Sequence, residues 1–178
     1  MPGKGSMRMD KPKIYLETTM FSFYYEERTA PPYLEYKAEV YRIFDLIKVR
    51  EFEAYTSPYA IKEINNETNQ EKQEKMKALA SECGAVMLPI TKEVERLAGL
   101  YIQEGAVSPA WETDAAHIAV TTFNGLDFIV SLNFTHIVRP WTIERVRRVN
   151  RREGYQGIGI YKPAEVLASY EDSTGLQE

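Results

Sequence analysis

Four side chains that carry oxygen ligands, Glu17, Glu63, Asp114 and Asn133, stand where strands are predicted to end or helices to begin. In an open parallel α/β sheet the ligand crevice lies outside the carboxyl ends of the strands, so these side chains can converge at one edge. Carboxylate and amide oxygens grouped without Cys or paired His suit Mg²⁺ or Mn²⁺. Such an ion activates water and neutralises charge that develops on a phosphate. The residues therefore indicate a divalent-metal site that hydrolyses phosphodiesters.

Each of these residues also has an ordinary structural explanation. The helix dipole favours Asp114 in a first turn, Glu63 suits a solvated helix surface, and Asn133 can satisfy backbone groups at a strand end. Glu17 is harder to explain in this way, because its strand should be central and a buried carboxylate without a partner is costly. Spacing alone leaves the metal site and the structural roles both open.

The two histidines of the chain follow the predicted site residues closely. His117 lies one turn after Asp114, and His136 lies three residues after Asn133. Both could therefore approach the site, although we expect His117 to pack within a buried helix and His136 to cap or hydrogen-bond a loop. Of the two, His136 is the better candidate for a contact with a scissile phosphate.

Alternating strands and helices are predicted to position these side chains. Short apolar runs indicate strands at 14–17, 52–57, 85–90, 127–133 and 157–160. Periodicity, caps and Pro or Gly boundaries indicate seven helices. Three have predicted ranges of about 33–50, 114–123 and about 142–152. A fourth begins at Pro58 after the cap Ser57, a fifth ends at Gly84, a sixth runs from the cap Thr91 to Gly105, and a seventh begins at Pro163. Strands separated by helices imply a parallel sheet with helices on both faces. The predicted fold class is therefore α/β.

Length and composition fit a single domain. The chain has 178 residues, of which 44% are hydrophobic and 27% charged. We expect residues 1–12 to be a disordered tail or a remnant of expression, 13–170 to form the domain, and 171–178 to be a second tail. No apolar run approaches the roughly 20 residues of a membrane span, and the lone Cys83 rules out an intramolecular disulfide. We therefore expect a soluble, cytoplasmic protein with no membrane partner.

An arginine-rich segment gives this acidic chain one strongly basic stretch. The net charge of -4 argues against polyanion binding by the whole surface, but six arginines accompany a single acid between residues 139 and 152. The segment could grip an RNA backbone, dock an acidic antitoxin segment or form a solvated face. An aromatic run at 21–25 could stack bases or make a dimer contact, although we expect core packing for at least half of it.

Four motifs resemble those of a known family. They are IYLETTMFSFYYEE at 14–27, TSPYAIKEI at 56–64, TDAAHIAV at 113–120 and FIVSLNFTHI at 128–137. In this order they resemble the motifs of the PIN-domain ribonucleases, particularly the VapC-like toxins of toxin-antitoxin pairs, and the resemblance spans roughly residues 13–168. The resemblance implies a three-layer α/β/α sandwich with a central, mainly parallel sheet.

The resemblance also implies roles for individual residues. It makes Glu17, Glu63 and Asp114 ligands of Mg²⁺ or Mn²⁺, puts Asn133 at the position of the last acid, and makes Thr19 the small hydroxyl of the family. The family usually has Asp at the positions of Glu17 and Asn133. Glu is longer but can still coordinate, whereas Asn keeps an oxygen ligand and gives up a negative charge.

The function implied is a metal-dependent endoribonuclease that cleaves RNA as the toxin of a toxin-antitoxin pair. Thr19, His136 and Arg139 are expected to contact the substrate, and an antitoxin and a second copy of the chain are expected partners. The alternative is a PIN-like domain that binds RNA or a protein without cleaving, as the departures at Glu17 and Asn133 suggest. A phosphate-handling domain of receiver type fits less well, because its paired acids and lysine are not found at the required strand ends.

Overall fold

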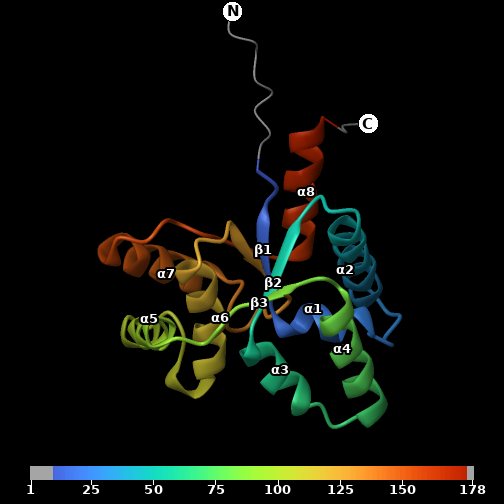
Figure 1. The fold of residues 1–178 in the computed structure, drawn as a ribbon, viewed down its shortest axis with the longest axis horizontal. Coiled ribbons are helices and arrows are strands. Elements are labelled where there is room, and N and C mark those ends of the chain that lie inside the picture. Colours follow the sequence, from blue (N-terminus) through green and yellow to red (C-terminus); the bar gives the residue numbers. More distant parts are fainter. Residues whose placement is uncertain (1–9, 176–178) are drawn as a thin grey trace, which may run out of the picture.

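The sheet at the centre of the molecule is entirely parallel. The computed structural model describes residues 10–175. Five strands lie in the order β3-β2-β1-β4-β5, namely β1 (Lys13–Leu16), β2 (Glu53–Thr56), β3 (Val86–Met87), β4 (Phe128–Val130) and β5 (Gly159–Tyr161) (Figure 1). All four pairs of neighbouring strands are parallel, which confirms the α/β class predicted from the sequence.

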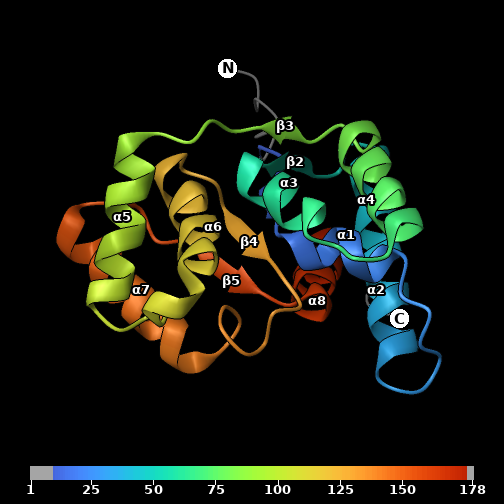
Figure 2. The same ribbon diagram turned by 90° about the horizontal axis from the view of Figure 1, so that it is seen from below.

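Helices cover both faces of this sheet (Figures 1 and 2). One face carries α5 (Lys92–Gln103), α6 (Glu112–Phe123) and α7 (Pro140–Glu153). The other carries α1 (Thr18–Tyr24), α2 (Tyr33–Lys48), α3 (Pro58–Asn65), α4 (Gln70–Glu82) and α8 (Pro163–Thr174). The arrangement is consistent with three layers, helix, sheet and helix. Within residues 10–175, no helix is long and apolar enough to cross a membrane.

Alternation along β1 divides the interior into two cores. Ile14 and Leu16 pack toward α1, α2 and α8, whereas Tyr15 packs toward α5 and α6, and all three are fully buried. In β4, Ile129 joins the core of Tyr15, and Val130 joins that of Leu16. Central parallel strands are buried on both faces, which explains why these segments are continuous apolar runs in the sequence.

The order in which strands are added to the sheet changes side at β1. From β1 the chain proceeds to β2 and β3 on one side, and later to β4 and β5 on the other. The carboxyl ends of β1 and β4 therefore flank a topological switch point, where open α/β sheets bind ligands. Figure 2 views the molecule from the edge at which these strands end.

Several predicted element boundaries differ from the structure. The run at 85–90 forms only a two-residue strand, in which Val86 and Met87 are 54% and 46% exposed, because β3 lies at the sheet edge and pairs only with β2. The run at 127–133 leaves the sheet after Val130. Helix α1 is absent from the predictions, and the aromatic run at 21–25 lies on it and just after it. Phe21 is buried and the other three rings are packed against the same core, so core packing is confirmed.

The two predicted helix caps have different outcomes. Thr91 caps α5 by accepting a hydrogen bond from Val94 N at 3.2 Å, as predicted. Helix α3 begins at Pro58 after Ser57, as predicted, but the Ser57 hydroxyl makes no capping bond and lies 2.6 Å from the Tyr15 hydroxyl. Helix α8 continues to Thr174, past the expected domain end at 170. Most of the expected tail at 1–12 and residues 176–178 of the second tail lie outside the described residues.

Candidate active site

Glu17 lies at the switch point and is held there by hydrogen bonds. It follows β1 directly and caps α1, and only 1% of the residue is exposed. Its Oε2 accepts bonds from Thr19 N at 3.0 Å, Thr19 Oγ1 at 2.5 Å and Ser131 Oγ at 2.8 Å. Burial raises the pKa of the Glu17 carboxyl, and the charge of His117 and these bonds offset only part of the rise. The site thus contains a carboxylate that is costly to ionise.

Thr19 joins the two central strands at their ends. Its hydroxyl donates to Glu17 and accepts a bond from Leu132 N at 2.8 Å. The Thr19 side chain is half-buried. Its two hydrogen bonds hold the loop after β4 against the start of α1. The structure therefore places Thr19 beside Glu17, where the sequence predicted a small hydroxyl at the substrate.

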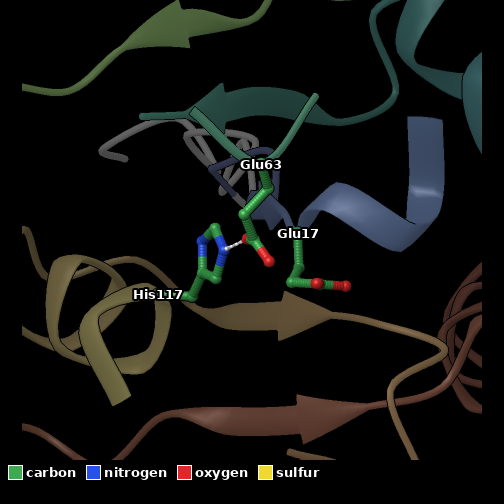
Figure 3. A group of neighbouring side chains, drawn as sticks. All are labelled: Glu17, Glu63 and His117. Carbon is green, nitrogen blue, oxygen red and sulfur yellow. Dashed lines mark hydrogen bonds and ion pairs between the residues drawn. The ribbon is translucent and has the colours of Figure 1, made fainter. Parts of the chain in front are cut away.

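Glu63 and His117 form a pair between two helices, α3 and α6 (Figure 3). His117 Nε2 makes a very short hydrogen bond to Glu63 Oε1, which also accepts one from Thr18 Oγ1 at 2.7 Å. The other ring nitrogen, Nδ1, lies 2.6 Å from the Tyr15 hydroxyl. Tyr15 in turn contacts Ser57, so a chain of four polar groups links Ser57, just after β2, to Glu63.

The pKa directions of this pair favour the charged forms of both groups. Burial raises the pKa of Glu63, but the hydrogen bond and charge of His117 outweigh burial and leave it below its ordinary value. Burial lowers the pKa of His117, but the bond to Glu63 and the surrounding carboxylates outweigh burial and leave it above its ordinary value. In the metal-free protein, the imidazolium therefore neutralises one of the carboxylates.

Glu17, Glu63 and His117 are close enough to share an ion. One ligand atom from each lies within 4.8 Å of the other two. Ligand atoms about 2.1 Å from one ion lie within about 4.2 Å of each other, so at most a small side-chain adjustment is needed. The expected packing of His117 in a buried helix is found, and His117 also approaches the site, but its pairing with Glu63 was not predicted. Its position one turn after Asp114 was the available signal.

Asp114 lies beside this group rather than within it. It is buried in the first turn of α6, and burial and the charge of Glu63 raise its pKa. The charges of His117 and His136 and the side chain of Asn133 lower the pKa in part. Asp114 therefore feels the same charges as the group, but its carboxylate is not among the three ligands that lie within 4.8 Å. The structure thus brings all three predicted acids to one edge of the sheet.

Asn133 uses its side-chain oxygen within its own loop. Oδ1 accepts a bond from His136 N at 3.0 Å, and Asn133 N donates to Ser131 Oγ at 2.9 Å. Because a backbone N–H only donates, the accepting atom must be the amide oxygen, which leaves the amide NH₂ to act on Asp114. An Asp at this position would bring a further negative charge to Asp114 and could not donate when ionised. Asn133 therefore lowers the pKa of Asp114 and uses its oxygen within its own loop.

Arg139 is engaged within the protein. Its Nε donates to Thr142 Oγ1 at 2.7 Å, and Nη2 lies 3.4 Å from the Ala106 carbonyl oxygen. These bonds fasten the start of α7 to the loop after α5. The predicted substrate contact through Arg139 would require this arrangement to open.

The basic stretch on α7 serves two roles in the structure. Arg145 donates to the Glu104 carbonyl oxygen at 2.7 Å, and Arg148 and Arg152 pair with the Glu104 carboxylate. Arg147 and Arg151 are exposed and have no hydrogen-bond or ion-pair partner among residues 10–175. Part of the stretch is thus structural, and two cations face solvent.

A large cavity of the described chain lies away from these residues. Its volume is about 1040 Å³, and Phe44, Phe52 and Cys83 are among its lining residues. It opens near the amino end of β2, at the opposite edge of the sheet from Glu17. No predicted site residue lines it, so the polar cluster at the carboxyl ends of β1 and β4 is separate from this cavity.

The carboxyl ends of β1 and β4 thus carry a buried carboxylate, a carboxylate–imidazole pair and a third acid whose pKa burial raises. These groups come from both helical layers and meet at the switch point of the sheet. No model of a known protein family matches the sequence, and no curated protein matches it.

Proposed function

We propose that this chain is a divalent-metal-dependent endoribonuclease with a PIN-like fold. Glu17 and Glu63 hold Mg²⁺ or Mn²⁺, and Asp114 completes the acidic site. The observation that supports this most is the burial of Glu17, at 1% exposure, beside Glu63 at the β1–β4 switch point. A buried carboxylate is seldom retained without an opposite charge beside it, and a divalent cation is the charge that this donor set suits.

Charge balance supports a cation at this place. Three carboxylates meet there, and a protonated His117 opposes their charge, with His136 acting on Asp114 as well. Burial raises the pKa of both Glu17 and Asp114, so ionising both carboxyls is unfavourable in the metal-free protein. A divalent ion offsets this repulsion and lowers both pKa values.

The residues of the chain divide the chemistry among them. A bound ion supplies Lewis acidity toward the phosphate and lowers the pKa of a bound water. Glu17 stays fixed by Thr19 and Ser131, so little reorganisation is required of it. Asp114, with its raised pKa and the Asn133 amide beside it, accepts the proton of the attacking water.

The resemblance to VapC-like proteins adds a cellular role and partners to the proposed function. The chain acts as the toxin of a toxin-antitoxin pair, cleaves RNA in the cytoplasm, and pairs with an antitoxin and with a second copy of itself. The two solvent-facing arginines, Arg147 and Arg151, suit contacts with phosphate or with an acidic antitoxin segment.

Cleavage of single-stranded RNA in Mg²⁺ and in Mn²⁺ tests the proposed function. Asp114→Asn and Glu17→Gln should abolish cleavage, whereas Glu112→Gln should not. Glu112 is a matched control because it lies in the same first turn of α6 as Asp114 but is exposed. Equal cleavage by all three variants would show that the activity belongs to a contaminant or to another site.

A non-cleaving PIN-like binder of RNA or protein is the second candidate. The neutral Asn133 and the pairing of Glu63 with His117 favour it, because both reduce the negative charge available to a metal. RNA binding by the intact protein without metal-dependent cleavage would support this candidate over the first.

A further inference from the structure

An exposed tryptophan is stacked on a histidine next to the candidate site. Trp111 ends the short 3₁₀ helix Pro109–Trp111, and its ring lies 4.3 Å from that of His136 at an interplanar angle of 24°. Although this contact covers part of the indole, Trp111 remains 48% exposed. The stack therefore presents a large flat aromatic surface to solvent.

Backbone contacts hold both members of the stack in place. Trp111 N donates to the Ser108 carbonyl oxygen at 2.9 Å, and Trp111 immediately precedes α6. His136 N donates to Asn133 Oδ1, and the His136 carbonyl oxygen accepts a bond from Thr142 Oγ1 at 3.3 Å. The surface is thus formed before any ligand arrives, which reduces the entropy lost on binding.

The stack adjoins the acids of the site. Trp111 lies three residues before Asp114, and His136 is close enough for its charge to lower the Asp114 pKa. A ligand that covers Trp111 is therefore next to the group that we propose accepts the proton of the attacking water.

The other tryptophan of the chain provides a contrast. Trp141 is 52% exposed, but its Nε1 donates to the Gly105 carbonyl oxygen at 2.8 Å and Arg145 lies 3.6 Å over its ring. Among the hydrogen bonds of residues 10–175, none involves Trp111 Nε1, and no cation covers its ring. Trp141 has a structural task in joining α7 to the end of α5, and Trp111 has no comparable one.

We propose that Trp111, backed by His136, is a stacking platform for one unpaired nucleobase of the RNA next to the scissile phosphate. The inference rests on the proposed function and specifies its substrate as single-stranded. Bases within a duplex are already stacked on both faces, whereas a base in a loop or single strand can leave its neighbours and stack on an aromatic ring. Stacking of this kind tolerates any base, because every base has a π face.

Fluorescence of a protein with one tryptophan tests the platform directly. The chain has two tryptophans, so Trp141→Phe leaves Trp111 as the only emitter. Asp114→Asn in the same protein prevents cleavage during the titration. We expect single-stranded oligoadenylate to quench the emission of Trp111 in a saturable way, and the corresponding RNA duplex to leave it unchanged. Binding of oligoadenylate without any change in emission would overturn the proposal.

Affinity measurements with labelled oligoadenylate provide the second arm. Trp111→Leu should bind about 5- to 100-fold more weakly than the intact protein, and Trp111→Tyr should recover most of the loss, because it restores an aromatic face. Trp141→Phe should bind as the intact protein does. A thermal unfolding midpoint for Trp111→Leu that matches that of the intact protein excludes misfolding as the cause.

Cleavage assays on the same variants separate this proposal from the proposed function. Cleavage and affinity that are both unchanged in Trp111→Leu would overturn the platform and leave the nuclease standing. An affinity that depends on Trp111, without metal-dependent cleavage by the intact protein, would support the platform and overturn the nuclease. A surface that serves a protein partner instead would give unchanged RNA affinity in Trp111→Leu, which also overturns the platform.

Discussion

Glu17 carries a carboxyl group whose ionisation is opposed by burial. Its carboxylate is almost wholly buried, and burial raises its pKa above the ordinary value of 4.5. At pH values below its ordinary pKa, the Glu17 carboxyl is protonated in both the folded and the unfolded states. As the pH rises through the raised folded-state pKa, the folded state must ionise a buried group, and stability is lost. The metal-free protein should therefore become less stable as the pH rises above about 4.5.

Replacing Glu17 with Gln should remove this loss. The amide oxygen can still accept the bonds from Thr19 and Ser131, and the buried charge is gone. We expect the thermal midpoint of the metal-free variant at neutral pH to exceed that of the intact protein by on the order of a few degrees. Thermal melts across pH in EDTA measure this difference. Glu51→Gln, at an exposed carboxylate, should change neither the midpoint nor its pH dependence.

His117 should influence which ion binds. Its Nδ1 contacts the Tyr15 hydroxyl, so its Nε2 faces the acids, in the manner of a metal-ligating histidine whose other nitrogen is held by hydrogen bonding. Imidazole nitrogen suits transition metals better than Mg²⁺, which prefers oxygen. His117→Gln should therefore weaken Mn²⁺ binding by roughly 10-fold or more and weaken Mg²⁺ binding less.

Calorimetry in buffers with different ionisation enthalpies gives an independent readout of His117. Its pKa is raised in the metal-free protein, so a metal that takes Nε2 must displace a proton. The number of protons released on Mn²⁺ binding should fall in His117→Gln. Equal proton release by both proteins would mean that His117 stays paired with Glu63 and is not a ligand.

The elements explain how much of the site was visible in the sequence. Glu17 and Asp114 were found because apolar runs reveal where strands end and because capping preferences reveal where helices begin. The pairing of His117 with Glu63 could not be found in this way, since it depends on how α3 meets α6 across the sheet. The use of the Ser57 hydroxyl by Tyr15, in place of a cap, has the same cause. Local pattern fixes the elements, and contacts between distant elements decide the roles of side chains.

On helix α7, too, local pattern predicts the helix and contacts with another element decide the roles of its charged side chains. The sequence shows six arginines, but only the packing of α7 against the end of α5 separates those bound to Glu104 from those left in solvent. If the free pair contacts RNA, Arg147→Gln combined with Arg151→Gln should weaken binding. The slope of log affinity against log salt should become shallower by about 1.4, since each phosphate contact contributes about 0.7 on a single strand.

Arg148→Gln is the matched control for that double variant. Its guanidinium pairs with Glu104 and Glu144, so its loss should leave the salt slope nearly unchanged. The measurement is an affinity titration with single-stranded RNA over a range of salt concentrations. Identical slopes for all the proteins would place the RNA backbone elsewhere and leave the solvated or antitoxin-binding interpretation of Arg147 and Arg151.

At the scale of the whole molecule, the candidate site is where the two helical layers meet. Glu63 comes from α3, whose apolar side chains belong to the core of α1, α2 and α8. His117 and Asp114 come from α6, which belongs to the core on the other face. The class of fold, its parallel sheet and the two covered faces were predictable, because buried strands and amphipathic helices leave strong patterns. The meeting of the layers at one edge follows from the strand order, which no local pattern encodes.

A metal bound at this meeting point should stabilise both layers at once. An ion that binds only the folded state at 100 times its dissociation constant adds about 2.7 kcal/mol to the free energy of unfolding. For a chain of this size, that addition corresponds to a rise of roughly 5–10 °C in the thermal midpoint. Mn²⁺ should produce this rise in the intact protein and little of it in Glu17→Gln. Hydrogen exchange should slow in α3 and in the first turns of α6 together, because the ion joins them. Slower exchange in one of these helices alone would mean that the ion does not join Glu63 of α3 to His117 of α6.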